Sequence, residues 1–126
     1  MDPAPDRARR ALTPTIVHVF DGLPVTDLAA ALAWYERVMG RPPDMRPHDQ
    51  EATWQLADSA SIYVVVDRER AGRGLLTVIV AELDRLLAEL AGRGLTPVST
   101  EGQRGELRRA VFTDPDGNRV TFGQLP

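Results

Sequence analysis

The sequence has 126 residues, enough for one domain with its own core and too few for two. Apolar residues make up 43% of it and charged residues 26%, as in folded globular proteins, and a net charge of −3 with arginines interleaved among acids argues against nucleic acid as a partner. The absence of cysteine excludes disulfides, a thiolate nucleophile and cysteine-ligated metals, and without a signal peptide or an apolar run of membrane-spanning length we expect a cytoplasmic protein with no membrane partner.

The beginning of the chain predicts a leader followed by a strand. Pro, Arg and Asp dominate residues 1–13, and nothing there could anchor to a core, so we expect this segment to be disordered. A single domain is then expected over 14–126. Its first strand is predicted in the run TIVHVF at 15–20, which is rich in β-branched and aromatic residues and is followed by Gly22 and Pro24.

The next segment predicts a helix and three strands. Apolar residues recur with a 3.6-residue period after Asp27, and Gly40 closes the pattern, which indicates a helix. Further strands are expected, in chain order, near Met45, in ATWQLA at 52–57 and in IYVVVD at 62–67. The first half therefore reads as a β-α-β-β-β unit over about residues 15–67.

The second half, over about residues 75–125, predicts the same order of elements. A strand at 75–80 precedes a helix, and later strands flank a DPDG turn. An offset of 55 residues carries Leu28 to Leu83 and Pro42 to Pro97. Two amphipathic helices match by chance when they are slid past each other, but agreement of the whole order of strands and turns favours a duplicated unit.

A duplicated unit of this kind predicts a cavity. Its helix covers one face of the sheet, so the other face needs a cover, and the twin unit can supply it. Side chains from both sheets then line a cleft suited to small molecules. We therefore predict an α+β fold in which two tandem β-α-β-β-β units form a curved mixed sheet that bears a cleft.

Three segments carry a resemblance to a known family: VTDLAAALAWYERVMG, VAELDRLLAELAGRGL and FTDPDGNRVTF. They resemble the vicinal oxygen chelate superfamily, which includes glyoxalases, ring-cleaving dioxygenases and bleomycin-resistance proteins. The resemblance covers about residues 15–125. It implies a homodimer, with clefts built from both chains or from exchanged halves.

The resemblance also implies where a metal would be bound. Metal-dependent members carry His, Gln or Glu on the first strand of each half and an acidic or similar ligand on the last strand. The four corresponding positions fall on Phe20, Leu75, Thr121 and the valines at 64–66. None of these side chains is a good ligand for a divalent ion, so we expect no metal and no cofactor. A bulge at Gly22 could bring His18 inward instead, but a hydrogen-bonded strand histidine is the favoured interpretation.

The predicted strands supply the candidate ligand-binding residues, namely His18, Phe20, Trp54, Tyr63, Leu75, Thr77 and Thr121. The rings of Trp54 and Tyr63 would form flat walls for a planar organic compound, although rings at these positions can also simply fill a cavity. Trp34 and Tyr35 are expected to pack a helix onto the sheet. Acids near the expected cavity mouths, at Asp21, Glu101 and Glu106, are typical of solvated strand ends.

Two classes of function remain open. The favoured hypothesis is a metal-free protein that sequesters a small apolar or aromatic compound, as bleomycin-resistance proteins do. The alternative is a metal-independent isomerase or cyclase of secondary metabolism, in which His18, Tyr63 or an acid acts as a general acid or base. A metal-dependent lyase or dioxygenase is the least favoured, because the expected ligands are missing.

Overall fold

The computed structural model describes residues 15–126, and the predicted leader at 1–13 lies outside the described residues. The elements follow in the order β1 (Val19–Val25), α2 (Leu28–Met39), β2 (Met45–His48), β3 (Glu51–Ala57), β4 (Ala60–Val66), β5 (Leu75–Ile79), α3 (Leu83–Gly92), β6 (Ser99–Glu101), β7 (Arg108–Thr113) and β8 (Arg119–Gln124). Within this described stretch, neither helix has the length and apolar character that a membrane span requires.

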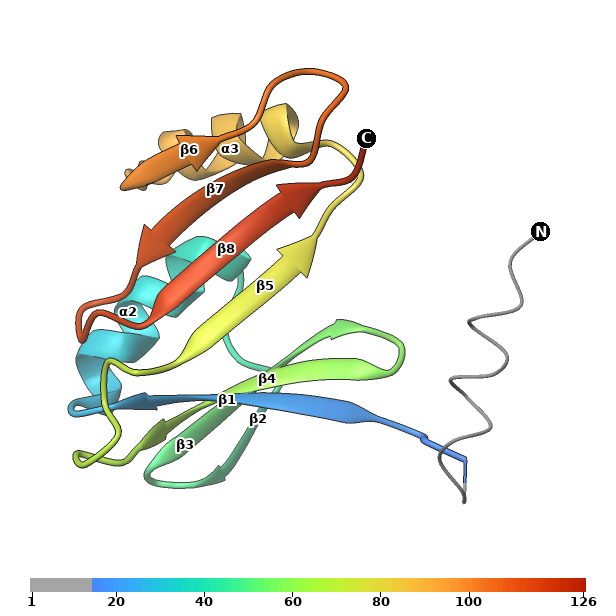
Figure 1. Cartoon of the computed structure of the whole chain (residues 1–126). Helices are drawn as coiled ribbons and strands as arrows, with labels where there is room; N and C mark the ends of the chain where they lie inside the picture. The colour runs from blue at the N-terminus through green and yellow to red at the C-terminus, as the bar shows by residue number, and fades with distance from the viewer. Residues whose placement is uncertain (1–14) are drawn as a thin grey trace.

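The strands form two four-stranded sheets of identical topology, in the orders β1-β4-β3-β2 and β5-β8-β7-β6 (Figure 1). In each, the first strand pairs in parallel with the last, and the remaining pairs are antiparallel. The prediction of two β-α-β-β-β units is confirmed. The two sheets are not joined to each other, since β1 and β5 each lie at the edge of their own sheet. The sequence predicted one curved sheet, and the structure has two sheets instead.

The first strand lies later in the chain than predicted, at Val19–Val25 rather than 15–20. The sequence prediction treated Gly22 and Pro24 as strand breakers. Both lie inside β1, where they pair with Tyr63 and Val65 of β4. Proline is tolerated there because β1 is an edge strand and the missing N–H removes no necessary ladder bond.

Helix α2 begins and ends where the sequence predicts. The Asp27 carboxylate accepts hydrogen bonds from the backbone N–H groups of Ala29 and Ala30, and Gly40 ends the helix with a φ of 73°. That left-handed conformation suits glycine, which has no Cβ. The buried face of α2 therefore meets the sheet in a fixed orientation.

One hydrophobic core serves both units. The helices lie on one side of the sheets (Figure 1), and between helices and sheets a single cluster of buried side chains runs from the first unit into the second. Its largest members are Trp54, Tyr35 and Phe112. Since the same core crosses from one unit to the other, the units are expected to fold together rather than separately.

The DPDGN turn joins the two units through a buried carboxylate. Asp114 accepts hydrogen bonds from the hydroxyl of Tyr35 on α2, at 2.9 Å, and from the side-chain amide of Asn118, at 2.7 Å. Its other oxygen accepts the backbone N–H groups of Asp116 and Asn118, both at 2.9 Å. Burial, together with the charge of Asp114, raises the pKa of Tyr35, so its hydroxyl stays protonated and donates.

Asn118 extends this junction to the first unit. Its amide donates to the Pro24 carbonyl at 2.7 Å and accepts the Gly74 N–H at 2.6 Å. The side chain is fully buried. Asn118 therefore fixes the end of β1 and the start of the segment that leads into β5.

A second junction connects the ends of the two helices. The Arg37 guanidinium donates to the carbonyls of Arg93 and Gly94, at 3.1 and 3.0 Å. Arg93 donates in return to the carbonyls of Arg37 and Val38. Each arginine thus bonds carbonyls at the C-terminal end of the other unit's helix, which lack helical partners and carry partial negative charge.

Candidate functional site

The candidate site lies on the face of the first sheet that the helices leave uncovered. Alternation along the strands divides the side chains, and those facing α2 are in the core. On the opposite face, the register aligns Gly22 with Tyr63 and Thr53, and in the next row Phe20 with Ser61 and Gln55. We call this the helix-free face.

Aromatic rings form a row on the helix-free face of the first sheet, from His18, which directly precedes β1, through Phe20 of β1 to Tyr63 of β4. The His18 and Phe20 rings have centroids 4.7 Å apart, and those of Phe20 and Tyr63 are 6.5 Å apart. The His18 Nε2 atom lies 2.8 Å from the Ser61 hydroxyl, which holds the imidazole against the sheet. More than half of Phe20, 55%, is exposed, so this row presents apolar ring surface to solvent.

Gly22 makes room for the Tyr63 ring. A Cβ at position 22 would lie 2.4 Å from Cζ of Tyr63, closer than any real contact, so only glycine lets the ring lie against β1. Among residues 15–126, the Tyr63 hydroxyl has no hydrogen-bond partner. It is therefore available to a bound molecule.

A hollow of about 550 Å³ opens beside Tyr63. This volume falls in the range of small-molecule sites. Four of the lining residues come from β1 and β4, and four come from the segment that leads into β5; together they are Gly22, Pro24, Tyr63, Val65, Asp67, Arg70, Arg73 and Gly74. We call this hollow the Tyr63 pocket.

The polar side of the Tyr63 pocket carries two arginines and one aspartate. Arg70 forms an ion pair with Asp67 at 2.9 Å, and this hydrogen bond holds the pKa of Asp67 below its usual value. Arg73 forms no ion pair with any residue in the described part of the chain. The pocket therefore presents one uncompensated positive charge beside an aromatic wall.

The second sheet carries the other predicted residues. Leu75, Thr77 and Thr121 line a separate hollow of about 200 Å³, where Leu75 is 71% exposed. The Arg109–Glu101 ion pair, at 3.0 Å, closes one side of it. The predicted site residues are thus divided between the two sheets.

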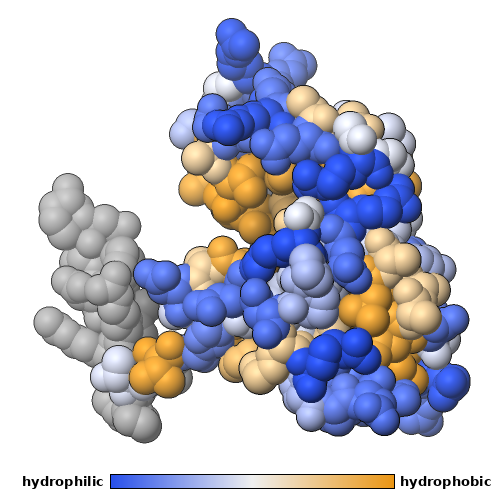
Figure 2. Space-filling view, turned by 180° about the vertical axis from the view of Figure 1, so that it is seen from behind, coloured by the Kyte–Doolittle hydropathy of each residue, from blue (hydrophilic) through white to orange (hydrophobic). Residues whose placement is uncertain are grey.

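The surface of the molecule has a notch between the upper and the lower part of the view in Figure 2, and hydrophobic side chains lie on both walls of this notch.

The prediction that Trp54 lines the open face is wrong. Trp54 is fully buried, its indole N–H donates to the Arg41 carbonyl at 3.1 Å, and its ring lies 6.1 Å from that of Tyr35. The reason is strand register. Trp54 is opposite Ile62, which faces the core, whereas Tyr63 is opposite Thr53. The two rings therefore lie on opposite faces of the sheet.

The register also locates the fourth position at which the resemblance implies a metal ligand. Thr121 pairs with Thr77. The offset of 55 residues relates Thr77 to Gly22, and Gly22 pairs with Tyr63. The counterpart of Thr121 is therefore Tyr63, and the placement at the valines 64–66 is corrected.

The side chains at these four positions do not fit a divalent ion. Phe20 and Leu75 offer hydrocarbon, Thr121 a neutral hydroxyl and Tyr63 a phenol, whereas such ions need carboxylate, imidazole or carbonyl donors. Over residues 15–126, no three His, Asp or Glu side chains gather closely enough to hold a metal.

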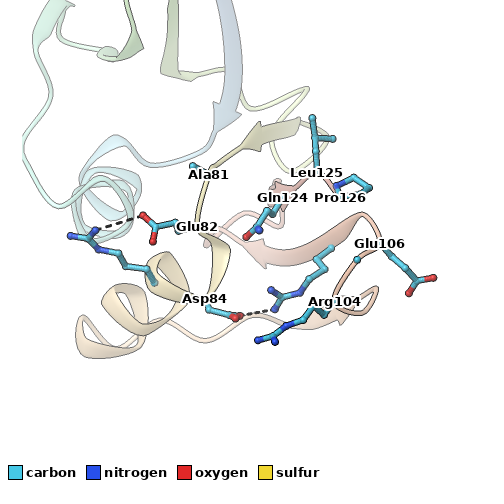
Figure 3. A pocket seen from close by; sticks show the side chains of 11 residues that line it. Ala81, Glu82, Asp84, Arg104, Glu106, Gln124, Leu125 and Pro126 are labelled. Carbon is cyan, nitrogen blue, oxygen red and sulfur yellow. Dashed lines mark hydrogen bonds and ion pairs between the residues drawn. The ribbon is translucent and has the colours of Figure 1, made fainter.

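Other acids predicted near cavity mouths have different environments. Asp21 is half-buried, and burial raises its pKa. Glu106 lines a polar hollow of about 440 Å³ at the start of α3 (Figure 3). There Asp84 pairs with Arg108 at 2.6 Å and Glu82 with Arg85 at 3.7 Å. This hollow is a mostly ion-paired surface that contains none of the predicted ligand-binding residues.

Two β-α-β-β-β units of the same topology, joined through the DPDGN turn, define the class of protein: a small domain built from two copies of one module. The family model described as Glyoxalase/Bleomycin resistance protein/Dioxygenase superfamily matches residues 15–122. The chain belongs to this superfamily. No curated protein matches the sequence.

Solved structures agree with this assignment. A glyoxalase/bleomycin resistance protein from Catenulispora acidiphila DSM 44928 is 37% identical, with a TM-score of 0.83 over 87% of this chain and 99% of that one. TnmS3, an antibiotic binding protein from Streptomyces sp. CB03234, is 23% identical, with a TM-score of 0.69 over 91% and 99%. Lactoylglutathione lyase from Agrobacterium tumefaciens is 17% identical, with a TM-score of 0.72 over 90% and 96%. The last two are similar in fold.

Proposed function

We propose that this protein binds a small, largely aromatic organic compound without a metal and releases it unchanged. The observation that carries the proposal is the partly exposed ring row of His18, Phe20 and Tyr63, beside a hollow of ligand size. Apolar walls with a few polar groups are typical of small-molecule sites. The similarity in fold to an antibiotic binding protein supports this choice within the superfamily.

The side chains at the four family positions support metal-independent binding. Two are hydrocarbon and two are neutral hydroxyl groups, at Thr121 and Tyr63. We expect protein purified without chelators to contain no stoichiometric zinc, iron, nickel or manganese when measured by elemental analysis. One equivalent of such an ion, bound by side chains of the cleft, would contradict the proposal.

Binding without conversion is tested by recovery of the compound. Aromatic metabolites are incubated with the protein, binding is measured by quenching of intrinsic fluorescence, and the compound is extracted and quantified by mass spectrometry. We expect saturable binding and full recovery of unchanged compound. Tyr63→Ala should weaken binding, because it removes the aromatic ring that lines the pocket.

One observation favours a second candidate, a metal-independent isomerase or cyclase. The His18 imidazole and the Ser61 hydroxyl are 2.8 Å apart, and the Tyr63 hydroxyl is unpaired within residues 15–126. Such groups can exchange protons with a bound molecule. Conversion of a bound compound by the wild type, lost in His18→Gln, would establish this candidate and reject simple sequestration.

A homodimer is also proposed. Both β1 and β5 are edge strands, and Phe20, Leu75 and Ile79 on them are each about half exposed or more. Apolar surface of this kind is typical of contact sites. Sedimentation at micromolar concentration should give a dimer, and a monomer would contradict this proposal. The cytoplasmic location stays a prediction from the sequence.

A further inference from the structure

We propose that the Tyr63 pocket selects compounds that join a flat ring to an anionic group, with the ring packed beside Tyr63 and the anion bound by Arg73. This inference rests on the proposed function and narrows it to a class of ligand. The narrowing concerns the charge of the ligand, because Arg73 can pair with an anionic group.

The charges that line the pocket support an anion. Asp67 lies 2.9 Å from Arg70, so these two side chains compensate each other. Arg73 lines the same hollow and has no carboxylate partner among residues 15–126. A guanidinium binds carboxylate or sulfonate oxygens through parallel N–H bonds, which makes it well suited to such groups.

The segment that carries Arg73 is held in place by backbone hydrogen bonds. The Asp67 N–H donates to the Val25 carbonyl at 3.0 Å, and the Arg73 N–H donates to the Arg70 carbonyl at 3.1 Å. At the other end, the Gly74 N–H donates to the buried Asn118 side chain. The backbone that carries Arg73 is therefore set before a ligand arrives, so binding has to order only the arginine side chain, which limits the entropy cost of binding.

A close approach within the segment reinforces this arrangement. Gly72 has a φ of 84°, and a Cβ there would lie 2.4 Å from the Asp116 carbonyl oxygen. The segment thus lies directly against the DPDGN turn. The segment that carries Arg73 is therefore in direct contact with the buried junction of Asp114 and Asn118.

The aromatic side of the pocket supplies the site for the ring. Gly22 and Pro24 of β1 and Val65 of β4 surround Tyr63 with small or apolar groups. A flat ring can stack on or meet the edge of the Tyr63 ring. The Tyr63 hydroxyl can donate a hydrogen bond to the ligand's anionic group, because no other described residue accepts it.

The test uses two fluorescent probes with the same rings. 8-Anilinonaphthalene-1-sulfonate carries an anion, and N-phenyl-1-naphthylamine lacks it. Both are titrated against the full chain and against Arg73→Gln, Tyr63→Ala and the control Arg68→Gln. Arg68 is an exposed arginine close by in sequence that does not line the pocket. Thermal midpoints verify that each variant is folded.

We expect Arg73→Gln to weaken binding of the sulfonate probe about fivefold to tenfold, because it removes one partly exposed charged contact. Its affinity for the neutral probe should change by less than about twofold. Arg68→Gln should change neither, and Tyr63→Ala should weaken both. Equal losses in the two arginine variants, or no loss in Arg73→Gln while the neutral probe binds, would overturn the inference and leave the proposed function standing. If neither probe binds the wild type, both fail.

Discussion

Replacing Tyr35 by Phe tests the buried junction between the two units. Asp114 accepts four hydrogen bonds, and this substitution removes the one from the Tyr35 hydroxyl, at 2.9 Å. Hydrogen bonds to buried charged groups contribute about 1.5–3 kcal/mol each, so the free energy of unfolding should fall by about 2 kcal/mol. For a domain of this size, that corresponds to a thermal midpoint lower by about 8 °C.

The matched control is the same chemical change at Tyr63, whose hydroxyl has no partner among residues 15–126. Tyr63→Phe should change the free energy of unfolding by less than about 0.5 kcal/mol. Both variants are compared with the wild type by urea unfolding followed through tryptophan fluorescence. If Tyr35→Phe is as stable as Tyr63→Phe, the hydroxyl–carboxylate bond does not stabilise the junction and the reasoning fails.

Three further substitutions test other parts of the structure. Gly22→Ala should displace the Tyr63 ring and weaken binding of the neutral naphthylamine probe several-fold. Gly92→Ala should leave binding unchanged, because a Cβ at position 92 would meet no atom within 4 Å. Asn118→Ala should lower the free energy of unfolding by about 3 kcal/mol or more in urea titrations, because it leaves buried polar groups unpaired, and a loss below about 1 kcal/mol would contradict this. Burial raises the pKa of Asp21 above its ordinary value of 3.8, so the folded state binds the proton more tightly and ionisation costs stability as the pH rises through the interval between the ordinary and the raised pKa. Asp21→Asn should therefore gain stability relative to wild type over that range, and a constant difference would refute the assignment.

Much of the fold could be predicted from sequence because its signals are local. The apolar stripes that begin at Leu28 and Leu83 predicted both helices, and their spacing revealed the duplication. The first strand was misplaced because Gly22 and Pro24 are breakers by local preference. Their pairing with distant β4 overrides that preference, and such pairing cannot be read from the segment itself.

The candidate site could be predicted only in part. Tyr63 was identified from its strand, but Trp54 was placed on the wrong face, because a one-residue change of register reverses every side chain. Arg73 was missed. It lies at residues 71–74, between the two units, where two glycines are typical of an ordinary turn. It reaches the pocket because a tertiary contact with Asn118 holds that segment against β1.

The reciprocal bonds of Arg37 and Arg93 have a consequence for how such a protein can change. They are made to backbone carbonyls at the helix ends, away from the helix-free face. Every residue type supplies the same carbonyl, so this junction at the helix ends places few demands on the side chains around it. Substitutions of the aromatic and charged side chains on the helix-free face therefore leave these bonds unchanged. New ligand preferences can arise in this way while the two units stay joined.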